Sequence, residues 1–402
     1  MKEYFTIDDF DYADKVVLVR INADSPIVNG KVEDNPRLSE DAKLLGNLAS
    51  KNAKVVALGH QSRPGKDDCI SLRDHAKIYA EKTGLKIKFV DDIFGEKTIK
   101  AIRHLKSGEI LILDNARFYE GEMVEKTSAE HHESELVQGL EKEIDYVVQN
   151  AFTNAHRAHA SMIGFTEVPN IAGPLFNKEI SSINEFINNT DPLTLVLGGL
   201  KIDDYLVIIE KCLKDNSAEK IIAGGALGEL CLMAKGIRLG AKEVFFEKEL
   251  LDMIPKLKTL LEKYDKKWLL PEDVAISKNN SRKNICIANL PTEEMIFDIG
   301  DATIDSFTKE INKAKKLYVK GPMGAYDKEG FTKGSRTIMK VIAESKAVSL
   351  VGGGHSSDLA EETKSGNFNH VSLAGGATLK MIAGEELPTT KFLKSNYIKF
   401  KS

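Results

Sequence analysis

The sequence lacks several features that would assign a function class at once. Its four cysteines, Cys69, Cys212, Cys231 and Cys286, lie far apart with no paired spacing, which argues against a disulfide framework and a zinc knuckle. No run approaches the roughly 18 apolar residues that a membrane helix needs, and the opening stretch MKEYFTIDDFDYADK is polar and acidic, unlike a secretory leader. We therefore expect a cytoplasmic protein with reduced thiols and no membrane partner.

Net charge is nearly absent as well. The chain has 56 Lys and Arg against 60 Asp and Glu, so no global positive field is available to hold nucleic acid. Any anion site must then be a local cluster. The GxxxxGK[ST] loop and the GxGxxG fingerprint are also missing, which argues against the commonest kinase and dehydrogenase templates.

What the sequence does contain is a regular alternation of short apolar runs with amphipathic, Lys/Glu-rich segments. That pattern is typical of an α/β fold in which helices cover both faces of a parallel sheet. With 402 residues, 42% of them hydrophobic, the chain is long enough for two domains of common size. We expect two Rossmann-like domains with one sheet each, built from the runs KVVLVRI, AKVVALGH, KIKFVDD, EILILDN and DYVVQNA, and then LTLVLGG, KIIAGG, WLLPEDV, MIFDIG, KLYVKGP, AVSLVGGG and HVSLAGG.

An amphipathic segment separates the two halves. Apolar residues recur at helical spacing from Phe176 to Ile187 before NNTDP ends the helix, which indicates an interdomain helix and hinge. We expect a first domain, the interdomain helix, a second domain, and a C-terminal segment that returns to the first domain, over residues 1–175, 176–190, 191–387 and 388–402 respectively.

Ligands of doubly wound sheets bind beyond the carboxyl ends of the strands. In the first half these positions carry arginines, histidines and a few other polar residues, which together would suit a small polyanion. The alternative is that they are surface or ion-paired residues. The set comprises Arg20, Asn22, Asp24, Arg37, His60, Arg63, Arg117, His156, Arg157 and His159.

In the second half the same positions carry glycines instead. Glycine lets backbone amides approach phosphate, and a following helix contributes its positive N-terminal end, so a nucleotide phosphate chain is the expected occupant. Any one pair of glycines is more often a tight turn. The glycines are Gly198–Gly199, Gly224–Gly225, Gly300, Gly321, Gly324, Gly352–Gly354 and Gly375–Gly376.

Motifs along residues 15 to 388 resemble those of the phosphoglycerate kinase family. VLVRINADSPI, GHQSRPG, LDNARFYEGE and NAFTNAHRAHAS are similar to its substrate-binding blocks, in the same order. LGGLKIDD, AGGALGELCL, LPEDVAI, DIGDAT, KGPMGAYDKEGF, VGGGHSSDL and SLAGGATLKMIAGEELP resemble its nucleotide-domain blocks. HRAHAS together with GPMG and a late GGG is specific in combination.

The resemblance implies reversible phosphoryl transfer between ATP and 3-phosphoglycerate, with Mg²⁺ accompanying ATP and ADP, by a monomer whose two domains close on a hinge. By position, Arg37 matches the catalytic arginine. His60, Arg63, Arg117 and Arg157 match the basic pocket for phosphoglycerate, and Asn22, Asp24 and His156 line its neighbourhood.

On the nucleotide side, the resemblance assigns Lys201, Gly353 and Gly354 to catalysis, and we add Lys320 to the catalytic residues as a hypothesis. The nucleotide contacts are the first phosphate loop, the adenine floor, the ribose contact and the later phosphate loops. They comprise Gly199, Lys201, Gly224, Gly225, Gly321, Pro322, Asp327, Gly353, Gly354, His355 and Gly376.

The sequence also departs from the family pattern at four positions. Tyr205 replaces a second lysine, His355 an aspartate that binds magnesium, Lys320 an asparagine, and Asn22 an aspartate. Losing a charge clamp on a transferring phosphoryl group costs on the order of 10³-fold in rate.

Two hypotheses would compensate for these losses. Lys320 would supply the missing positive charge, and Asp203 or Asp204 would help to hold magnesium unless both only cap a helix. Two other functions stay open: a catalytically weakened paralogue that still binds nucleotide or phosphoglycerate, and a kinase acting on a related phosphorylated acid.

Overall fold

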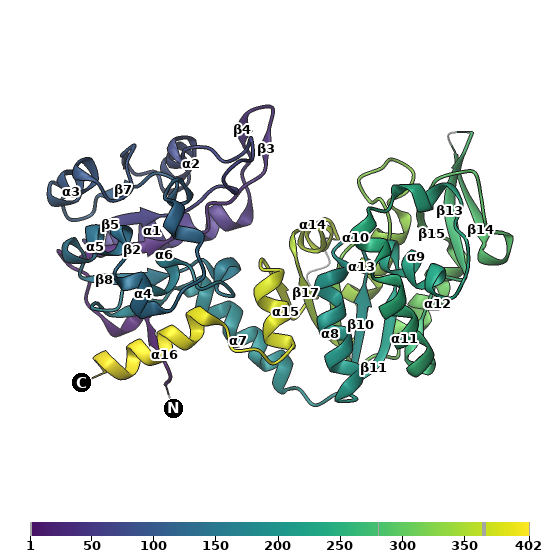
Figure 1. Ribbon diagram of the computed structural model, residues 1–402. Coiled ribbons are helices and arrows are strands. Elements are labelled where there is room, and N and C mark those ends of the chain that lie inside the picture. The colour runs from purple at the N-terminus through teal and green to yellow at the C-terminus, as the bar shows by residue number, and fades with distance from the viewer. Residues whose placement is uncertain (1, 280, 364–366, 402) are drawn as a thin grey trace. The chain divides into compact units, whose positions relative to one another are not determined.

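The computed structural model describes residues 2–279, 281–363 and 367–401 of the chain (Figure 1). The chain divides into two compact units. Unit 1 comprises residues 1–181 and 386–402, and unit 2 comprises residues 182–385. The boundary falls inside the long helix α7 (Pro174–Asn188).

Unit 1 is built on a seven-stranded sheet in which every neighbouring pair is parallel. The order across the sheet is β1-β9-β8-β2-β5-β7-β6. The strands are β1 (Phe5–Thr6), β2 (Val16–Arg20), β5 (Lys54–Leu58), β6 (Ile87–Phe89), β7 (Ile110–Ile112), β8 (Tyr146–Gln149) and β9 (Asn170–Ala172).

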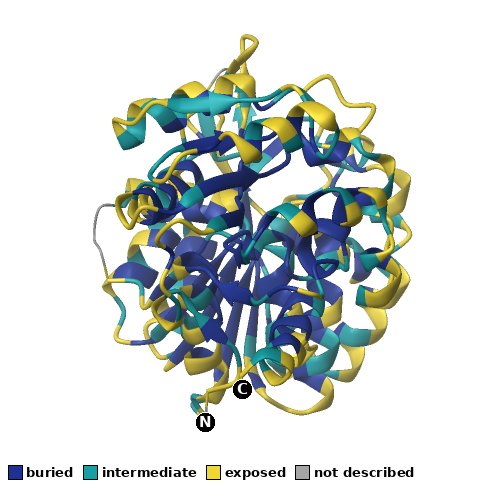
Figure 2. Cartoon of the chain, turned by 90° about the vertical axis from the view of Figure 1, so that its left-hand side faces the viewer, coloured by how far each residue is buried: buried dark blue, intermediate teal, exposed yellow. Residues whose placement is uncertain are grey.

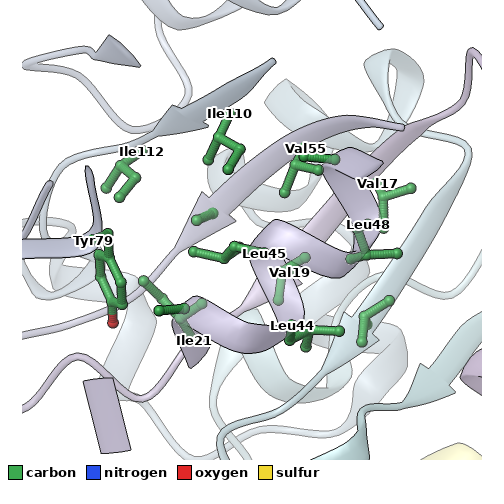
Figure 3. Close-up of a cluster of buried hydrophobic side chains, with 14 of the residues drawn as sticks. Val17, Val19, Ile21, Leu44, Leu45, Leu48, Val55, Tyr79, Ile110 and Ile112 are labelled. Carbon is green, nitrogen blue, oxygen red and sulfur yellow. The ribbon is translucent and has the colours of Figure 1, made fainter. Parts of the chain in front are cut away.

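Both faces of this sheet are buried, which explains why its strands are almost wholly apolar. Alternate residues point to opposite faces. Val17 and Val19 pack with Leu44, Leu45 and other residues of one cluster (Figure 3), whereas Leu18 belongs to the cluster on the other face. Figure 2 shows the result, with most of the strand residues dark blue and the outer faces of the covering helices yellow.

Helix α1 (Pro36–Ser50) of unit 1 begins at a recognisable signal. Asn35 caps α1, because its side chain accepts hydrogen bonds from the backbone N–H groups of Arg37 and Leu38, and Pro36 occupies the first turn. A two-stranded hairpin, β3 (Ile27–Val28) with β4 (Lys31–Val32), precedes it. The other helices are α2 (Arg73–Thr83), α3 (Glu96–Arg103), α4 (Ser128–His132), α5 (Glu135–Leu140), α6 (Ala160–Ile163) and α16 (Pro388–Phe400).

Unit 2 contains a second parallel sheet, of six strands in the order β12-β11-β10-β16-β17-β18. The prediction of an α/β fold with a helix-covered parallel sheet in each half is therefore confirmed. The strands are β10 (Leu193–Leu197), β11 (Ala218–Ala223), β12 (Trp268–Leu269), β16 (Lys316–Lys320), β17 (Val348–Gly352) and β18 (His370–Ser372).

Eight helices are described in unit 2 besides the end of α7. Among the described helices of both units, none combines the length and the apolar character that crossing a bilayer requires. The unit 2 helices are α8 (Ile202–Lys214), α9 (Gly225–Ala234), α10 (Lys248–Leu251), α11 (Ile254–Lys263), α12 (Asp301–Ile311), α13 (Lys333–Glu344), α14 (Gly354–Glu362) and α15 (Gly376–Ile382).

The expectation of one sheet in each half is wrong for unit 2. A separate antiparallel sheet, in the order β14-β13-β15, takes up the runs PEDV and MIFDIG, with strands β13 (Asp273–Lys278), β14 (Ser281–Cys286) and β15 (Ile296–Ile299). Lys278 pairs with Ser281, and a link this short cannot make the crossover that parallel strands need. Strand β14 is largely exposed, so SRKNIC lacks the apolar pattern that reveals buried strands.

The C-terminal helix α16 belongs to unit 1 and packs on β9 and α6 (Figure 1, yellow). Asn396 anchors it: its Oδ1 accepts from the Asn170 backbone N–H at 2.8 Å, and its Nδ2 donates to the Val168 carbonyl at 3.0 Å. Asn396 is 4% exposed, so these bonds are shielded from water.

Replacing Asn396 with alanine should lower the stability of unit 1 by about 2 kcal/mol, because the buried Asn170 N–H loses its acceptor. Hydrogen exchange of the β9 amides measures the change. Lys391→Ala, an exposed position of the same helix, is the control and should leave exchange unchanged. A similar effect of both substitutions would refute the anchoring role.

A second prediction concerns His75 on α2, which is fully buried and lies 3.1 Å from Gln61 Oε1. Burial lowers its pKa from 6.5 to about 4, so unfolded unit 1 takes up a proton below pH 6.5 that the folded unit does not. Stability is therefore lost as the pH falls. Between pH 7 and pH 5 the His75 contribution falls by about 2 kcal/mol.

The variant His75→Gln should flatten this pH dependence, since glutamine keeps a donor for Gln61 but does not titrate. Opening free energies from hydrogen exchange of the β2 and β5 amides at pH 7 and pH 5 provide the measurement. An identical loss in the original chain and the variant would show that another group carries the effect.

Candidate active site

The predicted residues of unit 1 lie at the carboxyl edge of its sheet, around strand β2. From β2 the chain first builds β5, β6 and β7 on one side, and then β8 and β9 on the other. This reversal makes β2 a topological switch point, which is where ligands of open α/β sheets bind. The loops that follow β2, β5, β7 and β8 contain every unit 1 residue predicted for the site except two: Arg20 is the last residue of β2, and Arg37 is in the first turn of α1.

Hydrogen bonds tie these loops together. Asp24 Oδ1 accepts from the Ser62 N–H at 2.8 Å, and Arg37 Nη1 donates to the Asp24 carbonyl at 3.3 Å. Arg117 Nη1 donates to the Ser62 carbonyl. The Thr153 hydroxyl donates to Asn22 Oδ1 at 2.9 Å. The structure thus brings the loops after β2, β5, β7 and β8 into one hydrogen-bonded group.

Neighbouring positive charges lower the pKa of two arginines in these loops. Burial first, and then the positive charges of Arg20 and Arg157, lower the pKa of Arg117 to about 10. The pKa of Arg157 is lowered by burial and then by Arg63. Arg63 thus disfavours the charge of Arg157, and Arg157 disfavours the charge of Arg117. We call these three residues the arginine cluster, and a bound anion would compensate their positive charge.

The histidines do not add to this positive charge, contrary to the idea of a pocket made basic by arginines and histidines alike. His60 is 2% exposed, and its Nδ1 accepts from Arg20 Nη2 at 2.8 Å, which requires an unprotonated nitrogen because guanidinium only donates. Burial and neighbouring arginines hold the His60 pKa well below 6.5, and burial lowers the pKa of His159 to about 3. His156 Nε2 accepts from Arg157 Nε at 3.3 Å.

Arg20 belongs to the protein interior, so the ion-paired alternative holds for this residue. Its guanidinium is 1% exposed and donates to Ser161 Oγ, the Ile21 carbonyl and His60, with Glu122 at 3.8 Å. No sequence pattern pointed to Glu122, a fully buried carboxylate that accepts from both the backbone and the hydroxyl of Ser161.

Asp41 on α1 was missed as well. It accepts from the Asn22 N–H at 2.6 Å and from Asn150 Nδ2 at 2.7 Å, and so fixes the start of the loop after β2. Burial raises its pKa to about 7. A single aspartate inside an amphipathic helix carries no pattern that distinguishes it from a surface residue.

Unit 2 shows the same reversal of strand order. From β10 the chain builds β11 and β12 on one side, and then β16, β17 and β18 on the other, so the switch point lies between β10 and β16. The predicted nucleotide residues follow β10, β11, β16, β17 and β18 at the carboxyl edge of this sheet.

The glycines at this edge fall into two classes. A side chain at Gly198, Gly224, Gly225 or Gly321 would collide with a neighbouring loop, mainly with Pro322 and Met323 or with the Gly198 carbonyl. These glycines are explained by the close packing of loops. For Gly353 and Gly375, in contrast, the nearest side chain is that of Lys320, and nothing lies within 4 Å of a Cβ placed on Gly354.

Gly300 follows an antiparallel strand and packs on Asp273, so it does not belong to this edge, contrary to the sequence-based grouping of the strand-end glycines. Gly353 and Gly375 are the N-caps of α14 and α15, and Gly376 is the first residue of α15. The N–H groups of a helix's first turn have no partner inside the helix, and they favour an anion.

Lys320 ends strand β16 with its ammonium almost fully buried. The residue is 5% exposed, and Nζ lies 3.1 Å from Asp204 Oδ2 and 5.3 Å from the centroid of the Tyr205 ring. A Cβ placed on Gly353 would lie 3.6 Å from Lys320 Cε, and one on Gly375 would lie 3.8 Å from Nζ. The ammonium therefore lies between the first turn of α8 and the two glycine loops.

The remaining predicted residues are more exposed. Lys201 is the N-cap of α8, and its positive charge helps to lower the pKa of Lys320, after burial. Asp203 is exposed, as are His355 and Asp327. The His355 ring lies 5.5 Å from that of Tyr326.

The two aspartates do not cap α8, since the helix begins at Ile202 with no side-chain capping bond and both aspartates lie in its first turn. Asp204 is paired with Lys320, which leaves Asp203 as the accessible carboxylate. Within residues 2–279, 281–363 and 367–401, no three His, Cys, Asp or Glu side chains form a group that could hold a metal by themselves.

A hollow of about 570 Å³ lies at the opposite, amino-terminal edge of the unit 2 sheet. Lys211, Lys267 and Lys316 line it, but these ammonium groups donate to Asp215, the Ala218 carbonyl and the Asn189 carbonyl. We assign the ligand site to the carboxyl edge, because there the glycine loops and a lysine converge.

Comparison with known proteins identifies the family. A family model described as phosphoglycerate kinase matches residues 7–385. The phosphoglycerate kinase of Methanobacterium bryantii is 36% identical over 397 residues, covering 97% of each chain. That of Methanothermus fervidus is 36% identical over 401 residues, covering 98% of each.

Solved structures agree with this result. The crystal structure of phosphoglycerate kinase from Pyrococcus horikoshii OT3 has a TM-score of 0.92 at 34% identity, covering 98% of this chain and 100% of that one. The structure from Coxiella burnetii has a TM-score of 0.77 at 26% identity, covering 98% and 99%. Because the matches extend over nearly the whole chain and include both sheets, the protein belongs to the phosphoglycerate kinase family.

Proposed function

We propose that the protein is a phosphoglycerate kinase that reversibly transfers the γ-phosphoryl group of ATP to the carboxylate of 3-phosphoglycerate, giving 1,3-bisphosphoglycerate and ADP. Within a chain of this family, the observation that carries the proposal is the arginine cluster at the switch point of unit 1. Arginines that lie close together and lower one another's pKa are expected where a polyanion binds.

Unit 1 would bind phosphoglycerate. Guanidinium groups hold phosphate and carboxylate oxygens in bidentate geometry, so Arg63, Arg117 and Arg157 are assigned to its anionic groups. Neutral His60 would act as a hydrogen-bonding group, and Asn22, Asp24 and His156 as polar neighbours. Arg37, at the start of α1, is assigned to the transferring phosphoryl group.

Unit 2 would bind the nucleotide. The loop at Gly199 and Lys201 and the starts of α14 and α15 at Gly353, Gly354, His355 and Gly376 are assigned to the phosphates, together with Lys320. The adenine would lie at Gly224 and Gly225, near Gly321 and Pro322, and Asp327 would contact the ribose.

The reaction requires neutralisation of the negative charge on the transferring phosphoryl group, and it does not require a strong base. A carboxylate oxygen of 3-phosphoglycerate is already ionised at neutral pH, and it attacks the γ-phosphorus as the bond to the ADP oxygen breaks. The protein must bring the reacting atoms to about 3 Å and stabilise the negative charge of the transferring group. We propose α7, which contributes residues to both units, as the pivot for this approach.

Magnesium would enter with the nucleotide. Mg²⁺ keeps several waters and binds one or two carboxylates beside phosphate oxygens, where it neutralises phosphate charge. Asp203 is the better candidate of the predicted pair Asp203 and Asp204, because Lys320 already occupies Asp204. We further propose that the enzyme acts as a cytoplasmic monomer that does not bind nucleic acid.

A second candidate is a weakened paralogue that binds its ligands without efficient turnover, which the buried Tyr205 at a cationic position of the family pattern favours. A coupled assay with 3-phosphoglycerate, ATP and Mg²⁺ separates the two. We expect turnover of roughly 1 s⁻¹ or faster, as is typical of kinases. Binding of both ligands without turnover would select the paralogue, and neither binding nor turnover with 3-phosphoglycerate would point to another phosphorylated acid.

The variant Arg63→Ala should raise the KM for 3-phosphoglycerate roughly tenfold to a hundredfold, because a charged hydrogen bond to the substrate is lost. The KM for ATP should stay the same. Arg63 is exposed, so folding is not at risk. Arg103→Ala removes an equally exposed guanidinium on α3, which pairs with Glu143, and serves as the control. Equal effects on both KM values, or none, would contradict the assignment of the cluster to phosphoglycerate.

A further inference from the structure

The side chain of Lys320 places a cation in unusual surroundings. Its ammonium is buried next to the N-terminal ends of α14 and α15, whose partial positive charge disfavours a neighbouring cation. Burial lowers its pKa, and Lys201 adds to this effect. A buried charge of this kind persists only where a partner holds it.

The partners come from two consecutive residues of α8. Asp204 Oδ2 lies 3.1 Å from Nζ, and the Tyr205 ring centroid lies 5.3 Å from it. The ring is itself 2% exposed and therefore fixed. An ammonium over a desolvated aromatic ring is stabilised by the ring quadrupole, and a carboxylate keeps it charged.

An ammonium has three N–H groups, whereas the described residues provide Lys320 with one hydrogen bond. Apart from the chain neighbours of each glycine, Lys320 also contributes the nearest side chain to a Cβ placed on Gly353 or Gly375. The unused donors are thus available beside the two loops that would receive the phosphates.

We propose that Asp204 and Tyr205 are positioning residues that hold Lys320 as a phosphate-contacting cation of the nucleotide site. The Tyr205 ring then stabilises the Lys320 ammonium by a cation–π contact. The positive charge comes from the end of β16, whereas the family pattern has a lysine in the first turn of α8. Asp204 acts as the counter-ion of Lys320 and does not bind magnesium. This inference rests on the nucleotide site proposed above.

Strand β16 offers a matched control at its other end. Lys316 is 6% exposed, its Nζ donates to the Asn189 carbonyl at 2.6 Å, and it lies 4.7 Å from the Phe186 ring centroid. It has the same residue type, the same strand and similar burial as Lys320, but it lies at the opposite edge of the sheet. A purely structural lysine at position 320 should therefore behave like Lys316.

The test compares Lys320→Met with Lys316→Met. We expect Lys320→Met to lower kcat on the order of 10²- to 10³-fold and to raise the Kd for ADP roughly tenfold, with the Kd for adenosine unchanged. Lys316→Met should change none of these constants. Equal effects of both substitutions, or an equal loss of ADP and adenosine binding in Lys320→Met, would overturn the proposal.

The positioning role of Asp204 is tested separately, by kcat and by the Mg²⁺ dependence of the rate. Asp204→Asn should lower kcat roughly tenfold at an unchanged KM for 3-phosphoglycerate, and Asp204→Glu should restore most of it. The Mg²⁺ concentration for half-maximal rate should not shift in Asp204→Asn, whereas a magnesium ligand would shift it strongly. Such a shift would overturn the counter-ion role.

The double variant Tyr205→Lys/Lys320→Asn returns the cation to α8, and it should turn over at least roughly tenfold faster than Lys320→Asn alone. If the unaltered protein shows no turnover with 3-phosphoglycerate and ATP, the proposed function fails. The affinities for ADP and adenosine then still test the role of Lys320, because Lys320→Met should weaken ADP binding alone and Lys316→Met should weaken neither.

Discussion

In a parallel sheet every strand delivers its carboxyl end to the same edge, and a reversal of strand order parts the loops at that edge. Both units of this protein obey that constraint, at β2 in unit 1 and between β10 and β16 in unit 2. The chemistry of each site then depends on which side chains follow the strands. Unit 1 places arginines there, and unit 2 places glycines and one buried lysine.

Buried partners stabilise charged or polar groups at both proposed sites. In unit 1, Arg20, Glu122 and Ser161 form a buried network, and Arg20 keeps His60 unprotonated by donating to it. In unit 2, Asp204 performs the supporting role for Lys320. In both cases a fixed partner reduces the cost of keeping charged or polar groups out of water before the ligand arrives.

Sequence patterns were sufficient for the parallel sheets, because strands buried on both faces must be continuous apolar runs such as VVLVR and LTLVL. They were insufficient for β14, whose polar residues lie on an exposed edge strand. The strand-end rule placed Arg63, Arg117 and Arg157 correctly at one edge. The rule could not distinguish them from Arg20, because the sequence near the end of a strand does not show whether an arginine side chain is buried or exposed.

Glycines show the same limit from the other direction. Gly198 and Gly321 were expected to bind phosphate. In the structure, glycine is needed at both positions because a Cβ would collide with the neighbouring loop. Glu122 and Asp41 escaped notice because a carboxylate in a loop or a helix is ordinarily on the surface. Side-chain burial and partner geometry, which depend on contacts far apart in the chain, decided these cases.

The central claim is that the two units hold different ligands at their switch points. Hydrogen exchange of the protein with ADP alone and with 3-phosphoglycerate alone tests it most directly. We expect ADP to protect the loops after β10, β16, β17 and β18, and 3-phosphoglycerate to protect those after β2, β5, β7 and β8. Protection of the same unit by both ligands, or the reverse assignment, would contradict it.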